Sequence, residues 1–297
     1  MKLSFAVETD IVRRPFLITL YGTPGIGKTT FGSKLPKPII LCAESGADQL
    51  RVAKRKVVSS SDIISKLKEL KEAEHDFETI VIDSLDALEN IIHKEVCDRE
   101  TVRVITDLAF GAGYAKALAI WKEIIAAIFE ARERLNICLI AHSMSKSFND
   151  PTKPLPYDRY TMKLNQKVSD LIFEGCDAVM FSDAEAKVLE QKGSDKGKIY
   201  EKGKHRIWTV PIPGAIAKSR YALPPVLDLD GELFIKLFNE AHAPEGELDN
   251  LKSSVNTLIS LMPESPQKIK AKQAMDGCKI ADDFRKLKER LEQLTKK

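Results

Sequence analysis

The residues with the clearest capacity for chemistry lie in the segment 16–30, FLITLYGTPGIGKTT. Gly22, Gly25 and Gly27 allow the backbone to curl so that successive amide N–H groups point inward, a conformation that a Cβ would obstruct. Lys28 adds a mobile positive charge for the β and γ phosphates of a nucleotide. The spacing Gly-x-x-x-x-Gly-Lys-Thr is the complete P-loop pattern, so the segment predicts a phosphate site.

The sequence on both sides of this motif agrees with the prediction. A strand-like apolar run precedes it, and a helix can begin at Thr29, whose hydroxyl can ligate Mg²⁺ while the helix N-terminus adds partial positive charge. An ordinary glycine-rich turn with a solvated lysine is the alternative, and motif and context together disfavour it. We expect ATP to be held by Gly22, Thr23, Pro24, Gly25, Ile26, Gly27, Lys28, Thr29 and Thr30.

A second motif follows at the apolar run 79–82, which ends in Asp83 as a Walker B strand requires. From the end of a buried strand, this carboxylate can hold the hydration shell of Mg²⁺ or orient Thr29. Such a run is a weak signal alone, but it follows a full P-loop at a suitable distance. Thr29 and Asp83 are therefore the predicted metal residues.

Two further apolar runs end in side chains that can do chemistry. The run 39–43 leads to Glu44, and the run 137–141 leads to His142. Ligands of open α/β sheets bind at the carboxyl ends of the strands, so both side chains are expected at the edge that carries the P-loop. The alternatives are a solvent-exposed glutamate at a strand end and a structural histidine.

A basic pair lies farther along the chain, at Lys218 and Arg220. Two residues apart, both side chains would leave an extended backbone on the same face. Such a pair is either surface decoration or a means of reaching a phosphate.

The elements that must position these residues follow an α/β pattern. Short continuous apolar runs are typical of parallel strands that are covered by helices on both faces. A further strand of this kind is expected at 178–181. Helical patterns are predicted at 62–74, 85–96, 115–134, 161–174 and 231–243.

Between these elements, several segments are expected to be irregular or to reverse direction. Residues 144–160 contain three prolines and many polar residues, which predicts a long loop, and the glycine-containing segment 110–114 predicts a mobile one. A hairpin is predicted with arms at 187–189 and 206–210. Its lysine-rich tip, which is expected to be a solvated turn in preference to a DNA contact, contains Gly193, Gly197 and Gly203.

The domain organisation is predicted from a change of pattern near the C-terminus. An edge strand at Leu3–Val7 would begin a core of residues 1–243, and Pro244–Gly246 marks its boundary. Residues 244–297 show only helical patterns, interrupted at 263–266, and are expected to form a small helical appendage.

Composition limits the classes of protein to which the chain can belong. It has 297 residues, of which 43% are hydrophobic, so it can bury a full core. With 46 basic and 43 acidic residues, the net charge of +3 neither requires nor excludes a nucleic-acid partner. The five cysteines show no metal-like spacing, and no apolar segment is long enough to cross a bilayer. We therefore expect no membrane partner and a cytoplasmic location, in the host cell if the chain is phage-encoded.

In their order along the chain, the P-loop, Glu44, Asp83, His142 and the Lys218-x-Arg220 pair resemble the RecA-like ATPase core. More narrowly, the chain is similar to phage nucleotide-binding proteins of the AAA_24 type, which include RecA-like single-strand annealing recombinases. The resemblance covers about residues 5–242 by element order. It implies an α/β fold in which a RecA-like P-loop NTPase core has a mostly parallel central sheet flanked by helices.

The resemblance also implies roles for individual residues. Glu44 matches the glutamate that polarises the attacking water, and His142 stands where the family has a polar sensor residue, often a glutamine. The pair Lys218 and Arg220 matches a K-x-R pair that reaches the γ-phosphate of a neighbouring subunit in several branches of the family. A homo-oligomer, either ring or filament, is implied.

Single-stranded DNA is the partner that the resemblance implies. The family's DNA-binding loops map to residues 98–115 and 144–160. Within these loops, the residues expected to contact phosphates or stack on bases are Arg99, Arg103, Tyr114, Lys146, Phe148, Lys153, Tyr157 and Arg159. A single-strand DNA-binding protein is a further candidate partner.

Together these expectations describe a Mg²⁺-dependent ATPase that acts on single-stranded DNA in phage recombination, annealing or replication. One alternative is a nucleotide-gated binding or scaffold protein with negligible turnover. A small-molecule kinase is a second alternative, but no arginine-rich lid is visible, and Glu44 and the Lys218-x-Arg220 pair would then lack roles.

Overall fold

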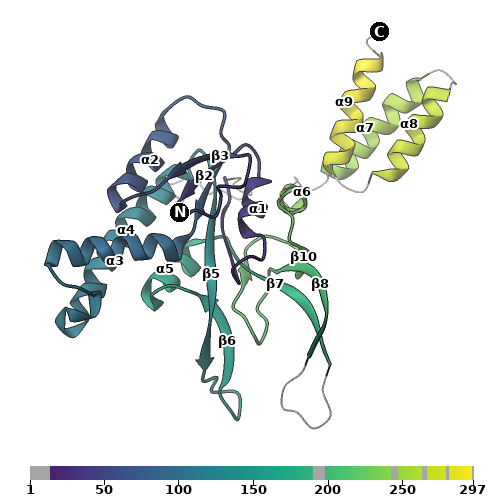
Figure 1. The fold of residues 1–297 in the computed structure, drawn as a ribbon. Coiled ribbons are helices and arrows are strands. Elements are labelled where there is room, and N and C mark those ends of the chain that lie inside the picture. The colour runs from purple at the N-terminus through teal and green to yellow at the C-terminus, as the bar shows by residue number, and fades with distance from the viewer. Residues whose placement is uncertain (1–13, 190–197, 242–246, 263–265, 279–280, 296–297) are drawn as a thin grey trace, which may run out of the picture. The chain divides into compact units, whose positions relative to one another are not determined.

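The computed structural model describes residues 14–189, 198–241, 247–262, 266–278 and 281–295 (Figure 1). These residues form a ten-stranded sheet and helices. The strands are β1 Leu17–Gly22, β2 Pro38–Cys42, β3 Ala53–Lys56, β4 Thr79–Asp83, β5 Asn136–Phe148, β6 Tyr157–Met162, β7 Ala178–Leu189, β8 Lys198–Trp208, β9 Lys218–Ser219 and β10 Val226–Asp228.

The sheet has the strand order β10-β8-β7-β1-β5-β4-β2-β3, with β6 paired to β5 and β9 paired to β7. The six strands from β7 to β3 in this order are parallel to their neighbours, whereas β6, β8, β9 and β10 are antiparallel additions. β1 is buried along its whole length, which explains its continuous apolar sequence. The expected α/β fold with a mostly parallel central sheet is therefore confirmed.

The helices of the described residues are α1 Lys28–Ser33, α2 Ser60–Glu72, α3 Leu85–Glu100, α4 Ala112–Ala131, α5 Gln166–Gly175, α6 Gly231–Ala241, α7 Glu247–Leu261, α8 Pro266–Gly277 and α9 Ala281–Thr295. Of these, α1 to α5 cover the two faces of the sheet. Side chains of α2, α3, α4 and α5 share one core cluster with alternate residues of the central strands, such as Tyr21 and Ile82. α1 lies on the opposite face, where Gly32 is close to Val81 and Ile140. No helix among the described residues is both long and apolar enough to cross a bilayer.

The largest difference from expectation is at 144–160, which is not a long loop. β5 continues to Phe148, and β6 pairs with it in antiparallel register from Ser143 opposite Met162 to Phe148 opposite Tyr157. The three prolines all lie in the intervening turn, where they break no ladder. The signal that could have predicted a strand was the alternation of serines with larger side chains from Ser143 to Phe148, which has the period of a β-strand. We call this two-stranded projection the β5–β6 ribbon.

This ribbon also changes the start of the next helix. Residues Thr161 and Met162, expected to be helical, belong to β6, and α5 begins only at Gln166. Asn165 caps the helix by accepting a hydrogen bond from the backbone of Lys167. An asparagine at this position is a strong start signal, and it explains the later boundary.

The segment 110–114 is more regular than a mobile loop. Two short 3₁₀ turns, Ile105–Asp107 and Ala109–Gly111, lead directly into α4. A Cβ on Gly113 would lie 2.5 Å from the carbonyl oxygen of Ile105, so this glycine permits a close packing contact. Glycine here reflects close approach of two backbones and not mobility.

The predicted hairpin exists, but its strands are longer than expected. β7 and β8 pair from Phe181 opposite Trp208 outward, with irregular register near Ala186. Gly203 lies within β8, not in the tip. A Cβ there would be 2.7 Å from Cβ of Glu185 on the paired strand. The positions Gly193 and Gly197 and the expected edge strand at Leu3–Val7 lie outside the described residues.

β3, with the sequence Ala-Lys-Arg-Lys, was missed because an edge strand that is largely exposed needs no apolar run. The chain also divides into two compact units, the second made of Tyr221–Leu223 and Glu232–Lys297. This division places α6 with the C-terminal helices, whereas the boundary expected at 243/244 placed it in the core.

The second unit has a core of its own. Phe238 of α6 contacts the ring of Tyr221 edge-on, at 4.9 Å between centroids. α7, α8 and α9 bury a separate apolar cluster made of Val255, Ile259, Met262, Ala271, Phe284 and Leu291. The helical character expected for the C-terminal residues is thus present.

Candidate nucleotide site

The P-loop connects β1 to α1 in the conformation that its glycines allow. Gly25 and Gly27 have φ angles of 76° and 110°, in the left-handed region that side chains with a Cβ rarely adopt. Gly22 is required for a different reason, since a Cβ there would lie 2.2 Å from the hydroxyl oxygen of Ser182 on the neighbouring strand.

Lys28, the first residue of α1, is 5% exposed. Its Nζ donates hydrogen bonds to the carbonyl oxygens of Gly22 at 3.0 Å and Thr23 at 2.9 Å. Burial lowers the pKa of Lys28, while the Asp83 carboxylate acts in the opposite direction. The ammonium is thus folded over its own loop, within the space where phosphates would lie.

Thr29 and Asp83 are in direct contact, as the two motifs predict. The Thr29 hydroxyl donates to Oδ2 of Asp83 at 2.7 Å, and Asp83 is 2% exposed at the end of β4. Burial raises the pKa of Asp83, and the Thr29 hydrogen bond and the Lys28 charge partly offset this rise. A hydroxyl beside a carboxylate suits Mg²⁺, which prefers oxygen ligands and keeps most of its coordination for water and phosphate. These residues therefore fit a magnesium ion.

A cavity of about 360 Å³ opens over these residues. It brings together the P-loop and side chains from three neighbouring strands or their ends. These are Asp83 at the end of β4, Glu44 two residues after β2 and His142 within β5. Among the other expected loop residues, Gly22, Thr23, Pro24 and Ile26 do not line it. The complete lining is Gly25, Gly27, Lys28, Thr29, Thr30, Glu44, Gly46, Gln49, Leu50, Asp83 and His142.

Glu44 lies two residues after the end of β2 and lines the cavity together with Asp83 and His142, whose charges act on it. Burial raises the pKa of Glu44, the Asp83 carboxylate raises it further, and His142 opposes both. The carboxylate therefore accepts a proton more readily than an ordinary surface glutamate.

His142 has a partner that the sequence did not reveal. Its Nδ1 lies 2.9 Å from Oδ2 and 3.1 Å from Oδ1 of Asp86, and its backbone N–H donates to Oδ1 at 3.0 Å. Burial would raise the pKa of Asp86, but these hydrogen bonds from His142 hold it below its ordinary value. With Nδ1 donating to a carboxylate, Nε2 is left as the nitrogen that can act in the cavity.

Asp86, Gln49 and Leu50 are the site residues that sequence reasoning missed. Asp86 lies in the first turn of α3, where an aspartate is readily explained by the helix dipole alone. Gln49 and Leu50 belong to a short turn after Glu44 and fit no motif. Only the position of Asp86, three residues beyond the Walker B aspartate, could have drawn attention to it.

Lys218 and Arg220 lie at the other end of the sheet. β9 pairs with the first residues of β7, Ala178 and Val179, whereas the P-loop residue Gly22 lies opposite Ser182 near the carboxyl end of the parallel strands. The structure therefore does not bring this pair into the cavity of its own chain.

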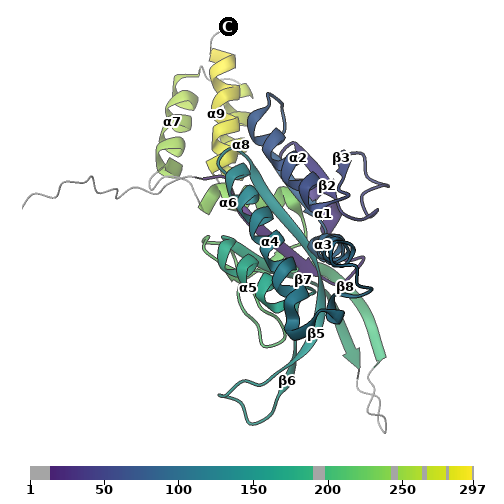
Figure 2. The ribbon, with the colours of Figure 1, turned by 90° about the vertical axis from the view of Figure 1, so that its left-hand side faces the viewer.

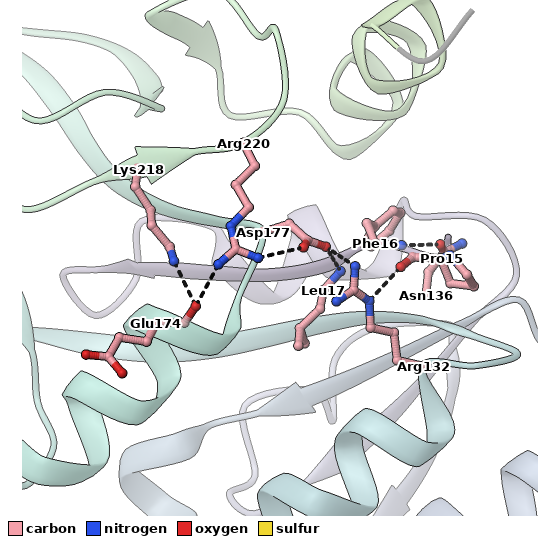
Figure 3. A network of polar contacts seen from close by, with 9 residues as sticks. All are labelled: Pro15, Phe16, Leu17, Arg132, Asn136, Glu174, Asp177, Lys218 and Arg220. Atoms are coloured by element: carbon pink, nitrogen blue, oxygen red, sulfur yellow. Dashed lines mark hydrogen bonds and ion pairs between the residues drawn. The ribbon is translucent and has the colours of Figure 1, made fainter. Parts of the chain in front are cut away.

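Both side chains are held at that amino end by polar contacts (Figure 3). Lys218 Nζ and an Arg220 guanidinium nitrogen donate to the same carbonyl oxygen, that of Glu174, at 3.1 and 3.0 Å. Arg220 also forms an ion pair with Asp177 at 3.7 Å. Asp177 in turn accepts from the backbone of Leu17 and from Arg132, so the pair is fastened to the start of β1.

The sequence matches the model of a known protein family. Residues 14–221 match the model of the family AAA_24, described as an AAA domain. The SPbeta prophage-derived uncharacterized protein YorG of Bacillus subtilis (strain 168) is 26% identical over 137 residues. This match covers 43% of the present chain and 41% of YorG, so the chain spans less than half of that relative.

Two solved structures are also similar in part. The KaiC-like protein PH0186 from the archaeon Pyrococcus horikoshii OT3 has a TM-score of 0.37 and 13% identity, covering 72% of this chain and 90% of that one. The RadB recombinase has a TM-score of 0.33 and 12% identity, covering 69% and 91%.

The match to the family model includes the P-loop, Asp83, His142 and the Lys218-x-Arg220 pair, and it extends over more than half of the chain. The chain belongs to the AAA_24 family of AAA domains and has a P-loop nucleoside-triphosphatase core.

Proposed function

We propose that this protein is a Mg²⁺-dependent ATPase that binds single-stranded DNA and acts in phage recombination, annealing or replication. The observation that carries the proposal is a cavity where a P-loop, a Walker B aspartate and a strand-end glutamate meet. The strand that supplies His142 to this cavity continues into the β5–β6 ribbon, which bears aromatic and basic side chains.

In the proposed reaction, the loop amides and Lys28 bind the phosphates of ATP. Thr29 and Asp83 would hold Mg²⁺, which supplies charge neutralisation on the phosphate oxygens. Glu44 accepts a proton from the attacking water, a role that suits a carboxylate whose pKa is raised by burial and by Asp83. His142, oriented by Asp86, contacts the γ-phosphate or the water through Nε2.

The ribbon offers a surface of the right chemistry for single-stranded DNA. Residues directly opposite in an antiparallel pair share a face, so Lys146 with Arg159 and Phe148 with Tyr157 lie together. The rings of Phe148 and Tyr157 are 5.7 Å apart, and the Arg159 guanidinium lies 3.7 Å from the centroid of Phe148. Stacking rings beside positive charges are how proteins bind single strands without sequence preference.

The face of β5 that carries Lys146 and Phe148 also carries His142, which lines the candidate nucleotide cavity. Along β5 the period of two places His142, Met144, Lys146 and Phe148 on one side of the strand. The ribbon projects away from the sheet on the side of the nucleotide edge (Figure 1; Figure 2). One strand therefore joins the cavity to the proposed DNA surface, and this connection supports stimulation of hydrolysis by DNA.

The second proposed DNA segment, 98–115, contributes less. Arg99 forms an ion pair with Glu95 at 3.5 Å, and the ring of Tyr114 contacts His93 edge-on at 5.7 Å. These contacts occupy two of the residues proposed for phosphate binding and stacking. We therefore assign the main DNA contacts to the ribbon.

Lys218 and Arg220 are proposed to act on a neighbouring subunit in a homo-oligomeric ring or filament. They lie at the opposite end of the sheet from their own cavity, and the Arg220 side chain is 59% exposed. A positive charge supplied in trans would stabilise charge that develops on the γ-phosphate and would couple hydrolysis to assembly.

A first prediction concerns Glu44. Glu44→Gln keeps the shape but removes the base, so nucleotide affinity should stay within about threefold while turnover falls by roughly 10²-fold or more. Steady-state phosphate release and equilibrium binding of a fluorescent ATP analogue measure the two effects. Asp48→Asn, the same change on an exposed residue of the adjoining turn, is the control and should leave both unchanged. Equal losses of binding and turnover would assign Glu44 a structural role.

A second prediction concerns the ribbon. Phe148→Ala should weaken binding of a labelled oligothymidylate about tenfold, because one stacked base is lost. Arg159→Ala should reduce the slope of log affinity against log salt concentration by about 1, as expected for one lost phosphate contact. Fluorescence anisotropy with ATP present measures both. Ser147→Ala, on the exposed opposite face, is the control. Wild-type affinity in both ribbon variants would show that DNA does not bind this surface.

A third prediction tests action in trans. Glu44→Gln and the double variant Lys218→Ala/Arg220→Ala should each be inactive, since a finger of this kind is worth about 10³ to 10⁵ in rate. Mixing them should restore part of the ATPase activity, because an intact cavity can then face an intact basic pair. Absence of recovery in mixtures shown to co-assemble would contradict action in trans, and full activity of the double variant alone would exclude the pair from the mechanism.

A further inference from the structure

Between Glu44 and β3 the chain forms a short turn that lines the candidate nucleotide cavity. The backbone N–H of Asp48 donates to the carbonyl of Ser45, and that of Leu50 donates to the carbonyl of Ala47. Ala47 is 1% exposed and fastens the turn to the protein interior. Gln49 and Leu50 then face the cavity. We call residues 45–50 the cavity turn.

The cavity turn is close to the groups that would carry out hydrolysis. A Cβ placed on Gly46 would lie 3.8 Å from Oε1 of Glu44 and 4.0 Å from the hydroxyl oxygen of Thr29. A small displacement of the turn would therefore move the candidate base relative to the candidate metal residue.

One side chain holds the end of this turn. Lys54 on β3 donates from Nζ to the carbonyl oxygens of Ala47 at 2.8 Å, Asp48 at 3.1 Å and Leu50 at 3.2 Å. An ammonium group has three protons, so all three donors find an acceptor. Three carbonyl oxygens of the turn thus converge on one positive charge, and the carbonyl of Ala47 also accepts from the N–H of Leu50.

The strand that carries Lys54 is itself fixed to the sheet. β3 pairs in parallel with β2, from Ile39 opposite Ala53 to Cys42 opposite Lys56, and the backbone of Val57 donates to Cys42. β2 is the strand that ends just before Glu44. Lys54 therefore closes a ring of contacts that runs from β2 through the cavity turn and back to β2.

We propose that Lys54 is a positioning residue for hydrolysis, which sets the cavity turn and, through it, the orientation of Glu44. This inference rests on the proposed ATPase function, since the rate it affects is that of ATP hydrolysis. Lys54 does not line the nucleotide cavity and acts through backbone carbonyls alone.

The role differs from that of a residue that only binds nucleotide. The phosphates would be held by the P-loop amides and Lys28, which Lys54 does not contact. Loss of Lys54 should therefore reduce kcat while leaving nucleotide affinity nearly intact. A shift of a catalytic group by about 1 Å can cost roughly 10²-fold in rate, so a smaller but clear reduction is expected.

The test compares Lys54→Met with Lys54→Arg in the full-length protein. We expect Lys54→Met to lower kcat about tenfold with the dissociation constant for a fluorescent ATP analogue changed less than about twofold. Lys54→Arg, which retains the charge and several donors, should recover kcat to within about threefold of the wild type. Lys56→Met on the same strand is the matched control and should behave as the wild type.

A second readout does not depend on turnover. Hydrogen–deuterium exchange should become about tenfold faster in peptides covering residues 44–52 of Lys54→Met, because the turn loses charged hydrogen bonds that protect it. If Lys54→Met does not fold, Lys54→Gln takes its place. A wild-type protein that binds nucleotide but shows no turnover would refute the ATPase function, while exchange would still test whether Lys54 holds the turn.

Two results would overturn the proposal. The first is a hydrogen–deuterium exchange rate for residues 44–52 of Lys54→Met that equals the rate in the wild-type protein. The second is an unchanged kcat, or a loss that falls on nucleotide affinity instead of kcat.

Discussion

The parallel register of the central strands is the constraint on which the candidate site depends. Gly22 lies opposite His142 on one side and Ser182 on the other, and Cys42 lies opposite Asp83. Because the register aligns the ends of β1, β2 and β4 with His142 in β5, Glu44, Asp83 and His142 come together from segments far apart in sequence. The lack of a Cβ at Gly22 permits the close approach of β7 that this register needs. Register thus determines which side chains share the cavity.

The balance of charge in the cavity follows from this arrangement. The charges of Asp83, Asp86 and Glu44 act on Lys28, and burial raises the pKa of Glu44 and Asp83, the two carboxylates that line the cavity. Asp86 differs because His142 satisfies it with hydrogen bonds. Asp86 therefore orients the His142 ring, and under the proposed function Asp83 would hold a metal and Glu44 would accept a proton. Different environments give similar side chains different tasks.

The sequence predicts those parts of the site that are local. The P-loop and the ends of the apolar strands were identified correctly, because short-range spacing and burial determine them. The contact between Asp86 and His142 joins residues 56 positions apart, and the Lys54 contacts depend on the fold of a turn that matches no motif. Neither contact could therefore be predicted from sequence spacing. The β5–β6 ribbon was predicted to be a loop because its segment contains three prolines, but all of them lie in the turn between the strands. The opposite placement of Lys218 depends on the pairing of β9, which two residues of sequence cannot specify.

The central claim is that this cavity hydrolyses ATP and that single-stranded DNA on the ribbon controls the rate. The most direct measurement is steady-state ATP turnover by the wild-type protein in Mg²⁺, with and without a saturating oligothymidylate. The account predicts measurable turnover that increases with DNA and is lost when Mg²⁺ is chelated. Binding of both ATP and DNA without turnover would contradict it and would favour a nucleotide-gated DNA-binding protein.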